Sequence, residues 1–116
     1  MTTIYIDGSA VLESGASERL LHLAEAGHEL VLVGKHDRAL RKGVPWSGRL
    51  PSLPSAPARG SWFVTADPAT CLDFQAGLRT VLVGPRDEGQ RPTRCDMTAR
   101  DLREAVLELL ASDAMR

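Results

Sequence analysis

The sequence predicts a three-layer α/β domain, in which helices cover both faces of a mainly parallel sheet of four or five strands. Short apolar runs typical of buried strands lie at residues 4–6, 29–33, 62–65 and 80–83. Segments with a helical spacing of apolar residues stand between them, and a right-handed strand–helix–strand crossover makes the joined strands parallel. A chain of 116 residues, 43% of them hydrophobic, fits one domain over residues 1–116 around a single core.

The first half of the chain supplies the first strand–helix–strand unit. Ser14 and Ser17 are both suitable N-caps for a helix over residues 16–26, which the following glycine is expected to end. The apolar run at 29–34 is the second strand. Residues 36–43 favour a short second helix, because its last turn is basic and it closes on a glycine.

A proline-rich segment separates the two halves. Four prolines between residues 44 and 60 remove amide donors and disfavour helix. Residues 49–53 are compatible with a short edge strand, where a proline is tolerated because one side of the strand forms no ladder. The pattern leaves an irregular loop as the alternative.

The second half repeats the alternation. After the strand at 62–65, Asp67 and the proline behind it are a typical helix start, and a short helix is expected over 69–75. Another strand follows at 80–84, and the polar residues 86–94 are expected to form a loop.

The chain closes on a helix that should pack on a face of the sheet. Residues 98–101 resemble a capping box with Asp101 in place of glutamate, which makes Thr98 the expected cap. Apolar residues then recur at helical spacing as far as about residue 111.

Composition excludes several classes of function. The formal net charge is −1 and no run of like charges occurs, so nucleic acid and anionic membranes are not expected partners. No basic segment followed by an apolar helix opens the chain, and a cytoplasmic location is expected. Cys71 and Cys95 have no metal-site spacing, so we expect small core residues, with a disulfide as the alternative.

Asp7 is the first candidate functional residue. It ends the first apolar run and is followed by small residues. Ligands bind at the carboxyl ends of the strands in open α/β sheets, so Asp7 stands where chemistry would be done. The alternative is a strand-end acid that accepts hydrogen bonds from the amides of the following turn.

Residues 4–12 resemble the first motif of the haloacid dehalogenase superfamily of phosphotransferases, in which an apolar strand runs into Asp-x-Asp-Gly-Thr/Val-Leu. Asp7 takes the place of the nucleophile, Ser9 that of the second aspartate, and Ala10 that of a glycine. Residues 76–84 are similar to the stretch that follows the fourth, acidic motif of that family. The resemblance implies a small Rossmannoid domain of this family without a cap domain.

The resemblance also implies a set of site residues. Asp7 and Ser9 stand at the catalytic positions, and Gly8 lies between them in the phosphate-binding loop. Gly34 stands where the family has a serine or threonine that contacts the phosphate, and offers only its amide. Charge neutralisation would come from Lys35 or Arg59, and the alternative for each is a solvated surface charge, which is the commoner state of such residues.

Magnesium would be held by Asp7 together with Asp67, unless Asp67 is only a helix cap. We expect no bound cofactor in an inactive protein and Mg²⁺ in an active one. Serine at position 9 cannot act as general acid and base at neutral pH, where a placed carboxylate contributes on the order of 10²- to 10⁴-fold. The expected function is therefore a binding or protein-association module with little phosphatase activity.

Two other functions follow from the same residues. One is a slow Mg²⁺-dependent phosphohydrolase with an aspartyl-phosphate at Asp7, and the other is an aspartate phosphoacceptor similar to a receiver domain. The expected partners are a small phosphorylated ligand and either a second copy of the chain or another protein. Such a contact would include Trp46, Leu50 and Leu53, whose apolar side chains we expect to be exposed.

Overall fold

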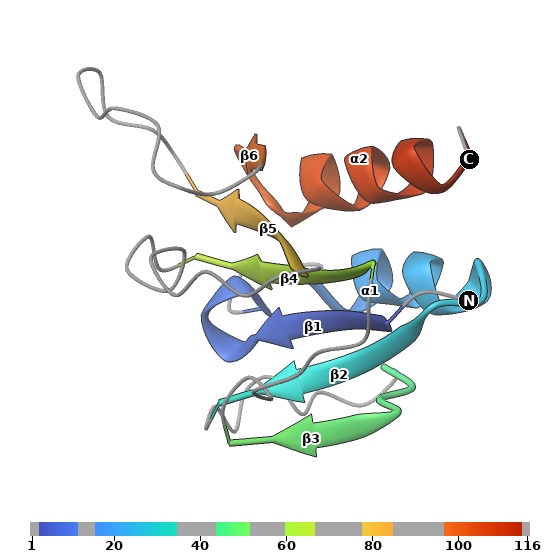
Figure 1. Ribbon diagram of the computed structural model, residues 1–116, viewed down its shortest axis with the longest axis vertical. Coiled ribbons are helices and arrows are strands. Elements are labelled where there is room, and N and C mark those ends of the chain that lie inside the picture. Colours follow the sequence, from blue (N-terminus) through green and yellow to red (C-terminus); the bar gives the residue numbers. More distant parts are fainter. Residues whose placement is uncertain are drawn as a thin grey trace.

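The computed structural model describes residues 3–11, 16–34, 44–51, 60–66, 78–84 and 97–114. Its centre is a twisted sheet in the order β3-β2-β1-β4-β5-β6, in which every described pairing is parallel (Figure 1). The strands are β1 (Thr3–Asp7), β2 (Glu29–Val33), β3 (Gly48–Leu50), β4 (Ser61–Thr65), β5 (Leu78–Val83) and β6 (Met97–Ala99). The predicted α/β class with a parallel sheet is confirmed.

The sheet has six strands among the described residues, and the prediction of four or five was too low. The additional strand is β6, whose three residues are too few for an alternation of apolar and polar side chains to show. The strand expected at 49–53 is confirmed as β3, which begins at Gly48 and ends at Leu50. Pro51 follows directly, and it lacks the amide that would extend the ladder.

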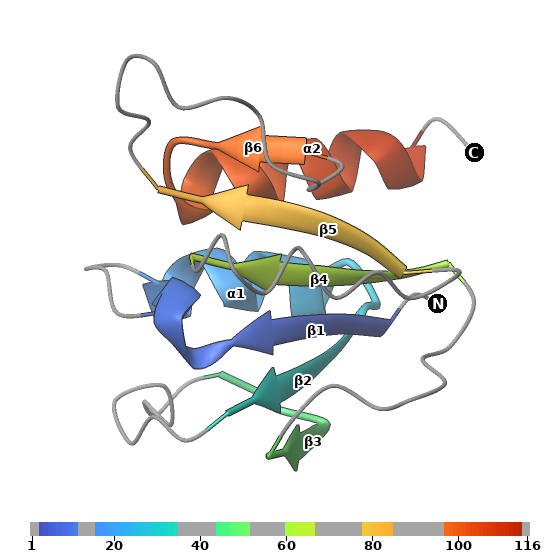
Figure 2. The same ribbon diagram turned by 60° about the vertical axis from the view of Figure 1, so that its left-hand side comes forward.

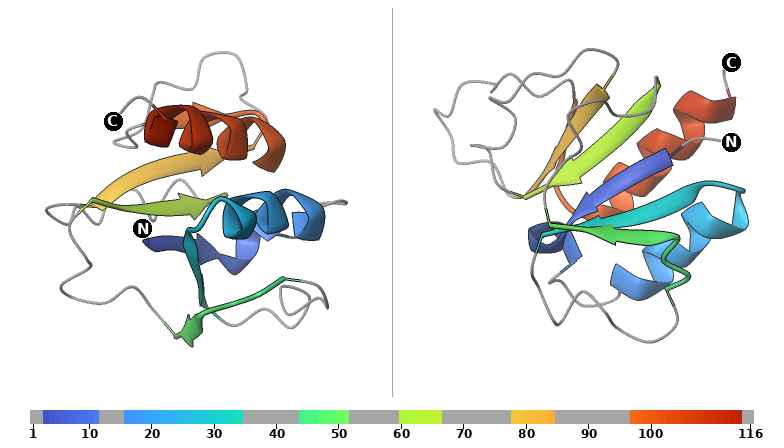
Figure 3. Two further views of the ribbon diagram at one scale, coloured as in Figure 1. Left: turned by 90° about the vertical axis from the view of Figure 1, so that its right-hand side faces the viewer. Right: turned by 60° about the horizontal axis from the view of Figure 1, so that its bottom comes forward.

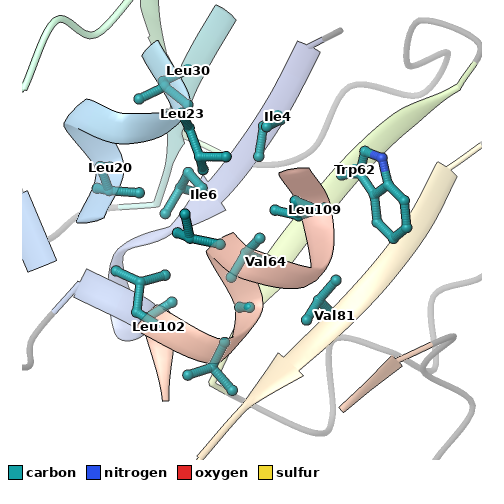
Figure 4. Close-up of a cluster of buried hydrophobic side chains, with 14 of the residues drawn as sticks. Ile4, Ile6, Leu20, Leu23, Leu30, Trp62, Val64, Val81, Leu102 and Leu109 are labelled. Atoms are coloured by element: carbon teal, nitrogen blue, oxygen red, sulfur yellow. The ribbon is translucent and has the colours of Figure 1, made fainter. Parts of the chain in front are cut away.

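Two described helices cover the same face of the sheet and contact each other (Figure 3). They are α1 (Ala16–Glu25) and α2 (Leu102–Ala114). Together with alternate strand residues they enclose the main core, part of which Figure 4 shows. The prediction that the C-terminal helix packs on the sheet is confirmed, whereas the helices expected at 36–43 and 69–75 lie outside the described residues.

The opposite face of the sheet is also apolar. Tyr5, Val33, Phe63 and Leu78 form a second buried cluster, against which Val31 and Leu50 pack. Strands buried on both faces are typical of parallel sheets, and they explain why β1 and β4 read as continuous apolar runs. Successive side chains of a strand therefore lie alternately in the main core and in the second cluster. This alternation decides on which face of the sheet a polar residue at the strand end lies.

The end of α1 is a Schellman motif. The amide of Gly27 donates to the Ala24 carbonyl (3.0 Å) and the amide of His28 donates to the Leu23 carbonyl (3.3 Å). Gly27 has a φ of 96°, which suits glycine. The predicted stop is thus correct, although the helix itself ends one residue earlier than expected, at Glu25.

The start of α2 corrects the predicted cap. Asp101 Oδ1 accepts a hydrogen bond from the Glu104 amide at 2.9 Å, so Asp101 is the N-cap and Glu104 is the third helical residue. Thr98, the expected cap, lies in β6. Within the described parts of the chain no helix is long and apolar enough to cross a membrane.

Candidate functional site

Asp7 is the last residue of the central strand β1 and is half-buried. Strand β2 flanks β1 on one side and β4 flanks it on the other, although β2 follows β1 in the chain and β4 comes much later. The chain therefore continues from β1 to β2 on one side, whereas β4 on the other side continues to β5, away from β1. The carboxyl ends of β1 and β4 mark the topological switch point, where ligands bind in such sheets. Figure 2 shows the carboxyl ends of β1 and β4 side by side.

Thr65, the last residue of β4, contacts Asp7 directly. Its hydroxyl donates a hydrogen bond to Asp7 Oδ2 at 3.0 Å. The register explains the contact: Ile6 pairs with Val64, so the next residues of the two strands lie at the same level and on the same face. That face is the one opposite α1 and α2, since Tyr5 and Phe63, two residues earlier on each strand, belong to the second cluster.

Thr65 is fully buried, whereas the carboxylate that it contacts is half-exposed. A hydroxyl that donates a hydrogen bond to a carboxylate limits the rotation of that carboxylate. The geometry thus presents an acid of defined orientation at the switch point. Thr65 was not predicted as a site residue. It is the polar end of an apolar strand, but its place beside Asp7 depends on the strand order, which the sequence alone does not give.

The turn after Asp7 is a 3₁₀ helix, η1 (Gly8–Val11), which lies against both β1 and β4. Gly8 is buried, and Ala10 belongs to the main core. The backbone at Ser9 belongs to this turn; its side chain is not among those described. The catalytic role predicted for position 9 and the substrate contact predicted for Gly8 stay predictions.

Gly34 follows the end of β2 at the same edge of the sheet, since Val33 pairs with Asp7. Its amide donates to the Leu50 carbonyl at 2.9 Å, so in this structure the amide holds the edge strand β3. Its φ of 95° lies in the left-handed region, which disfavours other residues. A phosphate contact through this amide, as predicted, would have to replace the bond to Leu50.

The remaining predicted site residues lie outside the described parts of the chain. These are the two basic candidates and the second acid, namely Lys35, Arg59 and Asp67, and the cysteines Cys71 and Cys95 also fall there. Lys35 directly follows Gly34 in the sequence, and Asp67 follows Thr65 by two residues. Their approach to Asp7 stays a prediction. Within the described residues no three His, Cys, Asp or Glu side chains form a group that could hold a metal ion.

The sheet order defines a doubly wound α/β domain, and the fold implied by the resemblance seen in the sequence is confirmed. The chain is similar to the crystal structure of D,D-heptose 1.7-bisphosphate phosphatase from B. bronchiseptica, which was complexed with magnesium and phosphate. The TM-score is 0.60 at 15% identity, covering 97% of this chain and 99% of that one. No family model matches the sequence, and no curated protein matches it. At this identity the likeness establishes the fold alone.

Proposed function

We propose that this chain is a haloacid-dehalogenase-like binding domain that takes a small phosphorylated ligand at the carboxyl ends of β1 and β4 and hydrolyses phosphomonoesters only slowly. The observation that carries the proposal is the Asp7 carboxylate, half-exposed at the switch point and held by the buried Thr65 hydroxyl. An oriented acid beside small residues is an arrangement that a ligand can use without reorganising the fold.

The class of ligand is argued from the neighbour of the same fold. The similar phosphatase was crystallised with magnesium and phosphate, so a phosphoryl group is the first ligand to consider for this chain. A phosphate beside the Asp7 carboxylate needs a compensating positive charge. Lys35 and Arg59 are the proposed side chains for that role. If the protein is active, Mg²⁺ on Asp7 and Asp67 would supply the charge and polarise the phosphoryl group.

Slow turnover is argued from two positions. Ser9 stands two residues after Asp7, where general acid–base catalysis needs a group that exchanges a proton near neutral pH. A serine hydroxyl does not do so unaided, and a loss on the order of 10²- to 10⁴-fold follows. The amide of Gly34 donates to Leu50, which removes a further donor from the site.

The test combines binding with turnover. Inorganic phosphate is titrated into the full chain with and without Mg²⁺ while backbone amide resonances are recorded. Under the proposal, the resonances that shift are those at the ends of β1 and β4 and in η1. Hydrolysis of a generic phosphomonoester stays far below the rate of ordinary enzymes, about 1–10³ per second.

Two results would contradict the proposal in different ways. Mg²⁺-dependent hydrolysis at about 1 per second or faster, lost in Asp7→Asn, would make the chain a phosphohydrolase that uses Asp7 as its nucleophile. Unchanged resonances at millimolar phosphate, with and without Mg²⁺, would exclude a phosphate site and leave protein association as the function to pursue.

We also propose that the chain associates with a second copy of itself, through contact residues that differ from those expected from the sequence. Trp46 and Leu50 are half-buried and pack against the main and the second cluster respectively, so the expected exposure of these side chains was wrong. Leu53 lies outside the described residues. The exposed positions of this segment are Pro45, Ser47, Arg49 and Pro51.

A further inference from the structure

We infer that Thr65 is a positioning residue of the proposed ligand site, acting on the ligand through Asp7. The inference rests on the proposed function and adds to it the group that keeps the carboxylate in its binding orientation. It starts from a feature of β4: a threonine hydroxyl stands at a fully buried position, on the sheet face that carries the second cluster.

A buried hydroxyl needs a hydrogen-bond partner, and a carboxylate is a strong one. The Thr65 Oγ1–Asp7 Oδ2 distance of 3.0 Å places that partner across two neighbouring strands, 58 residues apart in the sequence. Threonine is branched at Cβ and its side chain has few rotamers. Because Thr65 is enclosed and stiff, its hydroxyl holds Asp7 more firmly than an exposed serine on a loop could.

The chemistry of the Thr65 hydroxyl favours a role in positioning Asp7 over a direct contact with the ligand. A hydroxyl has one proton to donate, and Thr65 donates it to Oδ2 of Asp7. While that bond persists, Thr65 donates nothing to a ligand, and its effect on binding passes through the orientation of the carboxylate. Ordering the acid before the ligand arrives lowers the entropy cost of binding.

The residues of β2 beside Asp7 carry no hydroxyl, in contrast to Thr65 on the β4 side. Asp7 pairs with Val33, and Gly34 comes one residue later. Gly34 has no side chain and its amide donates to Leu50. A hydroxyl next to Asp7 is therefore supplied from the β4 side.

Two variants and a matched control test the inference. Thr65→Val keeps the shape of the side chain but lacks the hydroxyl, and Thr65→Ser restores the donor. Thr80→Val is the control, because Thr80 is also a buried threonine on the same sheet face but belongs to β5. For each, three quantities are measured: the affinity for inorganic phosphate with Mg²⁺, the urea midpoint of unfolding, and the ¹³C shift of the Asp7 carboxyl carbon.

The expected result is a loss of phosphate affinity on the order of tenfold in Thr65→Val, recovery in Thr65→Ser, and wild-type affinity in Thr80→Val. The Asp7 carboxyl resonance shifts in Thr65→Val only. Unchanged affinity in a folded Thr65→Val protein would overturn the inference and make the threonine a purely structural residue.

The remaining outcomes also decide the matter. If wild-type protein does not bind phosphate, the proposed function fails. The Asp7 carboxyl resonance still tests the role of Thr65, because an unchanged resonance in Thr65→Val would show that Thr65 does not position the carboxylate. If Thr65→Val does not fold, Thr65→Ser and Thr65→Cys replace it. A weak donor such as the cysteine thiol should then weaken phosphate binding relative to the serine variant, and equal affinities would contradict the inference.

Discussion

Single residues decide how the edge of the sheet around Asp7 is built, and Gly34 is the clearest case. Its φ of 95° allows the chain to turn after β2 so that its amide reaches Leu50. A non-glycine residue in this region costs on the order of 1 kcal/mol or more. The resemblance to phosphatases suggests Gly34→Thr as a way to restore a phosphate contact, but the backbone makes that substitution unsuitable.

We therefore predict that Gly34→Thr lowers the free energy of unfolding by about 1–3 kcal/mol and weakens the anchoring of β3. Urea denaturation of the variant measures the loss. Gly48→Ala is the matched control, since a Cβ there meets no atom within 4 Å and Gly48 is not among the positive-φ glycines. It should stay within about 0.5 kcal/mol of wild type. Equal stability of Gly34→Thr and wild type would show that the strand end adapts.

Ser9 is the position at which to restore activity. We predict that Ser9→Asp raises Mg²⁺-dependent hydrolysis of a phosphomonoester by at least tenfold, because a carboxylate exchanges protons where serine cannot. Ser9→Asn, which matches the size of aspartate without its acid, should give no increase. If both substitutions raise the rate of hydrolysis equally, or if neither raises it, another part of the site limits turnover.

At the scale of elements, the sequence predicts the longer strands, the edge strand β3 and the amphipathic helices, but not β6 or the order of the strands. The stop of α1 could be read from Gly27, since few residues other than glycine suit that backbone. β6 could not be predicted, because three residues are too few to show the alternation of apolar and polar side chains that is typical of a strand. The contact between Thr65 and Asp7 depends on the order of the strands, which local patterns do not encode.

The cap of α2 was misplaced for a related reason. Thr98 and Asp101 are both good capping residues, and only the extent of β6 shows that the helix begins after the second. We predict that Asp101→Ala lowers the free energy of unfolding by about 1 kcal/mol, whereas Asp101→Asn retains the accepting oxygen and most of the stability. Thermal or urea unfolding of the two variants distinguishes them, and equal losses would assign the effect to charge instead of to the cap.

At the scale of the whole molecule, the two edge strands among the described residues are each three residues long. Short edge strands offer few backbone groups to a second sheet, so continuous pairing between two copies is disfavoured. Any self-association through the segment at residues 44–51 must then use its side chains. Along this segment exposed residues alternate with half-buried ones, so that Arg49 is exposed to solvent and Leu50 packs against the second cluster.

The proposed homodimer predicts that a charge change at Leu50 affects the stability of the fold, whereas a charge change at Arg49 affects association. Leu50→Glu places a charge against the second cluster and should lower the free energy of unfolding by about 2 kcal/mol or more, whatever the oligomeric state. Arg49→Glu leaves stability within about 0.5 kcal/mol and should lower the mass measured by light scattering at a fixed protein concentration. A wild-type protein that is monomeric at high concentration would exclude the homodimer. A dimer unaffected by Arg49→Glu would place the contact away from β3, because reversing a charge inside the interface changes its interaction with every charged or polar group that it contacts.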